Sequence, residues 1–263
     1  MNFRTFIDMS KWGILLRILP LTALFCLTKW FVHQMHWGLG KSDSQIGSLL
    51  AAVTFILAFV LNGTLSDYRA SEDMPDQIVN AVETIQDTNL LIAARQPDYD
   101  PTLLTQGLVE ILNSVLLCLK QNKPFLRVEN TLTNLNQLLV PLSKFCEAPL
   151  MARLQGEQGK VRLVIARIQR IRDTDFLPSA YGLLHTLIIV ASFALLTTYT
   201  EYFIANLLVS GFLFTSFMYL LFLIYDLDNP FEYDGKSSAD IDLSPLEHSY
   251  HRLGTSLSEI NDP

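Results

Sequence analysis

The side chains best suited to chemistry follow directly after the last apolar run of the chain. Within residues 225–243, the segment YDLDNPFEYDGKSSADIDL gathers oxygen-bearing side chains, namely Asp226, Asp228, Asn229, Glu232 and Asp234. Carboxylate and amide oxygens are the ligands that hard divalent cations prefer. The same composition is also typical of an apolar helix that stops before Pro230 and continues as a solvated acidic tail. Both interpretations are open at this point.

Other arrangements that could bind a metal or catalyse a reaction are incomplete. Two histidine pairs, His33 with His36 and His248 with His251, stand three residues apart, but neither has the Cys or acidic partners of a zinc site. The stretch GEQGK at 156–160 lacks the length and the hydroxyl residue of a phosphate-binding loop. The sequence also lacks a G-x-S-x-G motif and a dinucleotide-binding fingerprint. It therefore predicts no enzyme activity, no cofactor and no metal site at the histidines.

The composition indicates a membrane protein. Half of the 263 residues are hydrophobic and only 17% are charged, whereas a soluble globular domain has about 25% charged residues. The net charge of −7 disfavours nucleic acid as a partner. The three cysteines are scattered without a C-x-x-C pair, which favours buried thiols over disulfides or zinc ligands.

Four apolar runs have the length of about 20 residues that a membrane-spanning helix needs. The first two cover residues 12–32 and 44–66, and the second of these contains no Asp, Glu, Lys or Arg. The last apolar stretch of the chain is interrupted by a single formal charge, Glu201. We therefore expect a hairpin of two further spans, near 182–198 and 203–225.

The first span carries two basic residues, Arg17 and Lys29, near its opposite ends. We expect both to extend their charged groups to the membrane surfaces. Trp12 and Trp30 stand where interfacial aromatic residues belong. A cleavable signal peptide is the alternative, but the run lacks a small-residue cleavage site and a second apolar segment follows it.

The polar region from 68 to 180 is predicted to form four helices. Pro75 suits the first turn of a helix, and apolar residues recur after it at helical spacing. A second helix carries an apolar stripe over 104–119, a third carries one over 132–142, and a fourth covers about 150–172. Such stripes are typical of helices that pack against one another in a core.

The sequence thus predicts an all-α membrane protein with two spans on either side of a large helical region. We expect residues 1–67 to hold the first two spans, 68–180 the helical domain, 181–225 the last two spans and 226–263 an acidic C-terminal tail. Both termini and the helical domain then lie on one side of the membrane. That side also holds most of the arginines that flank the spans, so the positive-inside rule places it in the cytoplasm.

Three segments resemble the bestrophin family. RIRDTDFLPSAYGLLHTLIIV, at 170–190, is similar to the stretch that leads into the third bestrophin span, with matches at Arg170, Ile171, Pro178, Tyr181, Leu183, Leu184 and His185. DLDNPFEYDG and DIDL resemble the acidic segment after the last span, with matches at Asn229, Pro230, Phe231, Asp234, Asp240 and Asp242. VTFILAFVL, at 53–61, resembles the pore helix. The likeness points to the divergent, bacterial-type branch of bestrophin-like membrane proteins, whose function is unassigned.

The resemblance implies a homopentameric ion channel with one central pore. Bestrophins line an apolar neck with the second helix of each subunit, and the positions carried over to this chain are Ala51, Phe55 and Phe59. Leu150 or Leu154 is the expected second constriction, on the cytoplasmic side. The family holds channels for chloride and other anions as well as channels for monovalent cations, and the neck carries no charge that decides between them.

For the acidic segment the resemblance implies calcium binding or a contact with a neighbouring subunit. The residues concerned are Asp226, Asp228, Asn229, Pro230, Phe231 and Asp234. The competing function is a non-conducting oligomeric anchor or regulator whose helical domain binds a cytoplasmic partner, because fold does not imply function. In both cases the expected partners are further copies of the chain and the lipid bilayer, with small ions added for the channel.

Overall fold

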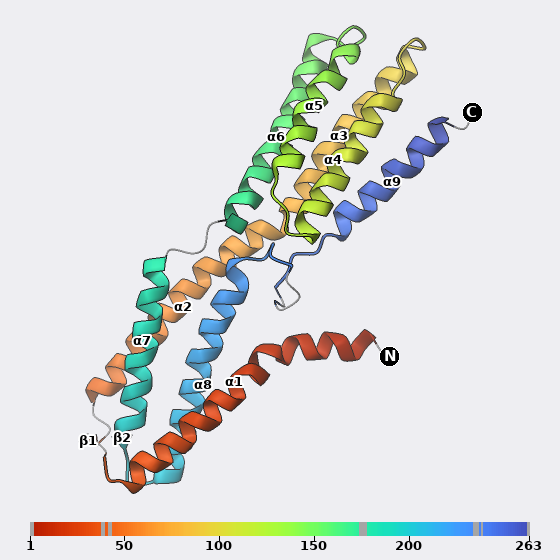
Figure 1. The fold of residues 1–263 in the computed structure, drawn as a ribbon. Coiled ribbons are helices and arrows are strands. Elements are labelled where there is room, and N and C mark those ends of the chain that lie inside the picture. The colour runs from red at the N-terminus through yellow and green to blue at the C-terminus, as the bar shows by residue number, and fades with distance from the viewer. Residues whose placement is uncertain are drawn as a thin grey trace. The chain divides into compact units, whose positions relative to one another are not determined.

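The computed structural model describes residues 3–37, 40–41, 44–173, 178–233, 237 and 239–261. Its helices are α1 (Phe3–Gln34), α2 (Ser44–Glu72), α3 (Met74–Arg95), α4 (Thr102–Lys120), α5 (Leu126–Leu142), α6 (Ala148–Asp173), α7 (Pro178–Thr197), α8 (Phe203–Asp228) and α9 (Ser244–Asn261) (Figure 1). The chain divides into two compact units. Unit one holds Met1–Tyr68 and Asp175–Asn229, and unit two holds Arg69–Thr174 and Pro230–Pro263.

Unit one consists of the four helices that the apolar runs predict. α1 packs along α8, and α7 contacts both of them (Figure 1). The core of this unit draws on all four helices and contains Phe25, Val53, Leu57, Leu184, Ile188, Ala191, Leu195, Phe217, Leu221 and Ile224. The helices run beyond the predicted spans, since α1 already begins at Phe3 and α2 continues to Glu72.

The two loops that join these helices meet in a minimal parallel sheet. β1 (Gly40–Lys41) pairs with β2 (Thr198–Tyr199), and Gly40 lies opposite Thr198. The connection between α1 and α2 is thereby tied to the connection between α7 and α8.

Five stretches of described helix are long and apolar enough to cross a membrane. Four of them contain the predicted spans: Trp12–Gln34, Ser44–Arg95, Ser179–Thr197 and Phe203–Asp228. The fifth is α4, whose apolar window is 56% buried inside the protein, against 11–28% for the other four. α4 therefore uses its apolar surface for contacts within unit two. The other four leave most of theirs for lipid or for further copies of the chain, as expected of a membrane protein.

The side chain of Lys29 is held inside unit one. We expected its ammonium group to reach a membrane surface, which stays a prediction, and the side chain is only 2% exposed. Its Nζ donates hydrogen bonds inside unit one, to the carbonyl oxygens of Leu195 and Thr198 and to Oγ of Ser210. The end of α7 attracts a cation because the last carbonyls of a helix lack intrahelical partners and carry partial negative charge.

Unit two contains the four helices predicted for the polar region, which are confirmed as α3 to α6. Pro75 lies in the first turn of α3, as expected. α3 packs on α6, and α4 packs on α5 (Figure 1). The leucines of the third predicted helix form its buried stripe: Leu132, Leu135, Leu139 and Leu142.

α9 was not predicted, because the acidic residues before it led us to treat 226–263 as a tail. It packs on α4 and α3. Its buried face holds Leu246, Ser249 and Leu253. Two ion pairs join its flanks to the same helices, Lys120 with Glu247 and Glu83 with Arg252. The signal that could have revealed this helix is a Ser-Pro start followed by leucines seven residues apart.

A buried polar network joins α3 to the start of α4. Asn89 has no exposed surface, and its Oδ1 accepts a hydrogen bond of 2.7 Å from the hydroxyl of Tyr99. The amide nitrogen of Asn89 donates to Oγ1 of Thr105 at 3.2 Å, and that hydroxyl donates to Oε1 of Gln86 at 3.0 Å. Burial is the main cause that raises the pKa of Tyr99 to about 12.

We expect Tyr99→Phe to lower the free energy of unfolding of unit two by about 1–2 kcal/mol, because Oδ1 of Asn89 loses its donor in a buried site. Thermal melting of the detergent-purified protein, followed by circular dichroism, measures the change. Tyr250→Phe, at a half-buried position of α9, is the matched control and should leave the melting temperature nearly unchanged.

The pH dependence of this effect has a defined sign. The pKa of Tyr99 is about 12 in the folded protein and 10.0 for an ordinary tyrosine. Its contribution to stability is therefore complete below about pH 10 and is lost as the pH rises toward 12. The wild type should lose more stability than Tyr99→Phe over this range, and equal losses would contradict the burial of the hydroxyl.

Candidate functional site

The predicted neck residues lie on the outer face of α2. Phe55 and Phe59 are each 72% exposed, and Ala51 is exposed one turn before them. Residues four apart share a helix face, so the three side chains form one stripe. Val53 and Leu57 are fully buried in the core of unit one and occupy the opposite face.

The exposed face of α2 differs in composition from the exposed faces of the other apolar helices. Between 44 and 66 its exposed residues other than the two phenylalanines are small or polar: Ser44, Gln45, Gly47, Ser48, Ala51, Ala52, Thr54, Ala58, Asn62, Gly63 and Ser66. The exposed residues of α1, α7 and α8 include many large apolar side chains: Leu24, Leu27, Ile189, Phe193, Ile204, Leu208 and Phe212. Outside its two phenyl rings, the open face of α2 therefore suits water better than lipid.

The two candidates for a second constriction differ in exposure. Leu154 has no exposed surface, since it is buried in unit two. Leu150 lies one turn earlier on α6 and is half-buried. A side chain without exposed surface cannot line a water-filled passage. Leu150 is therefore the better placed of the two, and its role as a constriction stays a prediction.

The matched residues of α7 meet the end of α8. The hydroxyl of Tyr181 donates to Oδ2 of Asp228 at 2.8 Å, and the hydroxyl of Tyr225 lies 2.7 Å from Nε2 of His185. The rings of Tyr181 and Tyr225 stack with their centroids 4.6 Å apart. These contacts hold the start of α7 against the end of α8, where the acidic segment begins. Helical periodicity alone could not pair these residues, because they are far apart in the sequence.

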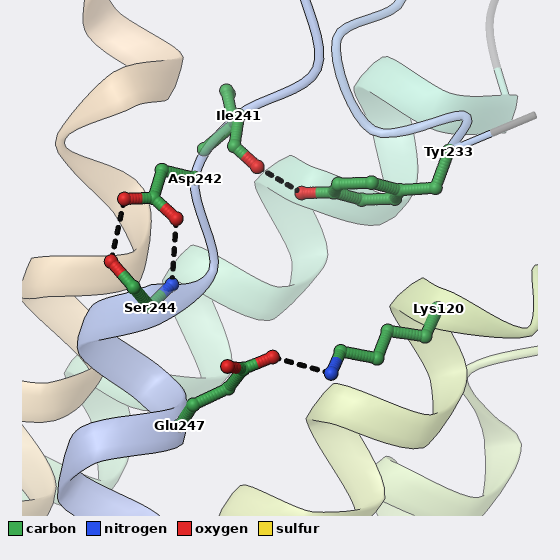
Figure 2. A network of polar contacts seen from close by, with 6 residues as sticks. All are labelled: Lys120, Tyr233, Ile241, Asp242, Ser244 and Glu247. Carbon is green, nitrogen blue, oxygen red and sulfur yellow. Dashed lines mark hydrogen bonds and ion pairs between the residues drawn. The ribbon is translucent and has the colours of Figure 1, made fainter. Parts of the chain in front are cut away.

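Beyond α8 the acidic segment folds back on itself within unit two. Pro230 and Phe231 are buried, and the N–H group of Ile241 donates to the carbonyl of Pro230 at 3.1 Å. The hydroxyl of Tyr233 donates to the carbonyl of Ile241 at 2.9 Å, as Figure 2 shows. These two bonds join Pro230 and Tyr233 to Ile241. The aromatic residue of the Asn-Pro-Phe motif has no exposed surface.

Asp242 organises the start of α9 (Figure 2). Its Oδ1 accepts a 2.9 Å hydrogen bond from the N–H group of Ser244, and its Oδ2 accepts one from the Ser244 hydroxyl. These two bonds hold the pKa of Asp242 below its ordinary value. One turn further on, Glu247 pairs with Lys120 of α4. The carboxylates after residue 240 thus build a helix start and its attachment.

The cation interpretation of the acidic segment stays a prediction. Asp228 already accepts a hydrogen bond from Tyr181, and Asp234 lies outside the described residues. Within the part of the chain that the structure describes, no three His, Cys, Asp or Glu side chains gather as a metal site. Calcium binding and the subunit contact are both left for experiment.

Neither a protein-family model nor a curated protein matches the sequence. Solved structures match nearly the whole chain. A crystal structure of a bacterial bestrophin homolog from Klebsiella pneumoniae, carrying a point mutation, gives a TM-score of 0.68 at 16% identity, over 95% of this chain and 100% of the other. This chain has the bestrophin fold. A second mutant structure of the Klebsiella pneumoniae homolog gives a TM-score of 0.69 at 13% identity, over 95% and 99%. A crystal structure of a membrane protein gives 0.74 at 13% identity, over 93% and 98%.

The bestrophin fold confirms the resemblance found in the sequence. The matches span both units of the chain, including the polar middle that the three matching segments do not cover. At these identities the likeness is one of fold. The role of each side chain in this bestrophin-like chain depends on its own surroundings and does not follow from the fold.

We expect Asp242→Ala to loosen α9, because the N–H group and the hydroxyl of Ser244 lose their charged acceptor in the first turn of the helix. The loss is about 1 kcal/mol for such a group. Trypsin cleavage at Arg252 of the folded protein should become several times faster. Asp87→Ala, which removes an exposed carboxylate from α3, serves as the control. Equal cleavage rates for both variants and the wild type would show that Asp242 does not hold the helix.

Proposed function

We propose that the chain forms a homo-oligomeric ion channel whose neck is lined by α2. The observation that carries this proposal is the exposed face of α2, where small and polar side chains surround the rings of Phe55 and Phe59. Several copies around one axis would turn this face toward a shared passage. The rings would then form an apolar constriction, which gates ions by wetting and dewetting.

The alternative surroundings for this face are the acyl chains of lipid, and its composition argues against them. The side-chain amides of Gln45 and Asn62 are exposed on it. Amides that face hydrocarbon lose the hydrogen bonds that water supplies, at a cost of about 4–8 kcal/mol each in the fully apolar limit. α1, α7 and α8 already offer the large apolar side chains that lipid accepts without such a cost.

Self-association is supported by surfaces in both units. One helix cannot enclose a passage, so a pore lined by α2 requires several copies. Unit two also exposes large apolar side chains, namely Leu103 at 58%, Leu126 at 66%, Val140 at 61% and Leu163 at 55%. Burial against a further copy would remove such side chains from water, which is favourable. A pentamer is the assembly that the family resemblance implies.

The transported ions are small, and side-chain charge does not select between chloride and monovalent cations. No formal charge lies between 44 and 66, and the first one after the neck is Asp67. Both termini and unit two are proposed to lie in the cytoplasm, on the side rich in arginine. For the acidic segment, calcium binding or a contact with a neighbouring subunit is proposed, as the family resemblance implies, because its carboxylates are of the type that calcium binds.

The second candidate function is a non-conducting membrane anchor or regulator. The exposed leucines of unit two favour it as much as they favour an oligomer, since a cytoplasmic partner would cover the same side chains. Such a protein would have no need of an exposed face on α2 whose side chains, apart from two phenylalanines, are small or polar. The composition of that face therefore favours the channel.

We expect Phe55→Ala and Phe59→Ala each to raise the single-channel conductance of the purified protein in planar bilayers by about twofold or more. Removing a ring widens the constriction and makes its wetting less costly. Phe212→Ala is the matched control, because Phe212 is 73% exposed on α8 and Phe55 is 72% exposed on α2. The control should conduct like the wild type.

Two results would contradict the channel or its neck. One is a purified oligomer that stays silent in bilayers for the wild type and for both neck variants. The other is equal conductance in the wild type, Phe55→Ala, Phe59→Ala and Phe212→Ala. Silence would favour the anchor, whereas equal conductance would keep a channel but remove α2 from its neck.

A further inference from the structure

A buried lysine lies at the end of unit one where β1 and β2 pair. Nζ of Lys29 donates to the carbonyl of Thr198 at 3.2 Å, to Oγ of Ser210 at 2.8 Å and to the carbonyl of Leu195. Its side chain is 2% exposed. The three partners use the three N–H donors of the ammonium group, so the side chain is held in one place.

The partners of Lys29 satisfy its hydrogen bonds but leave its charge only partly balanced. All three are neutral groups, and the C-terminal end of α7 supplies about half of a negative charge at most. A buried charge is costly unless a counter-charge lies close to it. Within the described part of the chain, no carboxylate pairs with Lys29.

A cavity of about 310 Å³ opens beside this lysine, between the ends of α1 and α7 and the start of α8. Its described lining carries two further groups that turn cationic on protonation, His33 and His36, and no Asp or Glu. Asn206 adds an amide, which donates one hydrogen bond to the carbonyl of Thr198 at 3.0 Å. A volume of this size is at the lower end of the range for small-molecule sites.

The residues that line the cavity are held in place by contacts inside unit one. The ring of His33 stacks on Phe203 with the centroids 4.1 Å apart and the planes 17° apart. Oδ1 of Asn206 accepts a hydrogen bond from Ser210, which is also a partner of Lys29. The lysine and the amide are therefore held together by shared neighbours, Thr198 and Ser210, and the imidazole is held by Phe203. Val32 and Leu196 add apolar surface to the same cavity.

We propose that this cavity binds an oxyanion, a phosphate group that is either free or part of a lipid head group. Lys29 supplies the buried positive charge, and His33, His36 and the second N–H group of Asn206 supply donors. Charged phosphate oxygens form strong hydrogen bonds with such donors. The apolar residues of the lining fit the glycerol backbone of a lipid, and this end of the apolar helices is where a head group would lie.

The proposal goes beyond ion conduction, and its test needs no current. The detergent-purified full chain is titrated with inorganic phosphate at constant ionic strength, and its melting temperature is recorded. In a second arm the protein is placed in nanodiscs of phosphatidylcholine, whose phosphate charge is compensated by its own choline cation, with or without phosphatidylglycerol, whose phosphate charge is not compensated. A rise with inorganic phosphate assigns a free oxyanion, and a rise with phosphatidylglycerol alone assigns a lipid head group.

The decisive variant is His33→Phe combined with His36→Phe, which keeps a ring against Phe203 but removes the imidazole donors. We expect it to weaken the apparent affinity for the active probe about tenfold, a change of about 1.4 kcal/mol. His251→Phe, at an exposed position of α9, should bind like the wild type. The proposal is overturned if neither probe stabilises the wild type, or if the double variant responds as the wild type does.

Discussion

α2 has two faces that need different surroundings. A single copy of unit one provides surroundings for only one of these faces. Val53 and Leu57 have no exposed surface, so the inner face is fully used within the protomer. They share one core with Phe25 of α1, Ile188 of α7 and Phe217 of α8. The outer face stays exposed in the single copy. An oligomer is the simplest way to give that face surroundings in which both its phenyl rings and its polar side chains are stable.

The two ends of the acidic segment after α8 make different contacts. At its start, Asp228 accepts a hydrogen bond from the hydroxyl of Tyr181. This bond joins the end of α8 to the start of α7. At its end, Asp242 accepts hydrogen bonds from the N–H group and the hydroxyl of Ser244, the first residue of α9. The buried Phe231 lies between them. The abrupt change from apolar to acidic sequence is thus the point at which the chain leaves unit one and enters unit two.

Periodicity and length were sufficient to predict most of this fold. The helices from α3 to α6 appear because apolar residues repeat at 3.6-residue spacing, and the apolar runs give α1, α2, α7 and α8 because few charges interrupt them. The hydrogen bonds of Lys29 could not be predicted, because one-dimensional reasoning sees a charge near a span end, but not the carbonyls of Leu195 and Thr198 that accept its N–H groups. α9 was missed because acidic composition outweighed the spacing of Leu246 and Leu253.

The candidate site was predictable in part. The stripe of Ala51, Phe55 and Phe59 follows from helical geometry, and its exposure agrees with a surface left for other copies. Leu154 was a poor candidate because burial depends on neighbours that α6 meets only in the folded unit. The cavity beside Lys29 could not be foreseen, since its walls join the end of α1 to the connection between α7 and α8, which lies far away in the sequence.

Unit two is built from two pieces of chain, Arg69–Thr174 and Pro230–Pro263, with α7 and α8 between them. The second piece brings Leu246 and Leu253, which are buried where α9 packs on α3 and α4. During synthesis the ribosome releases α3 to α6 well before it has made α9. The strip of α3 and α4 that α9 covers therefore stays open until α7 and α8 have been made, so the helical unit is closed last.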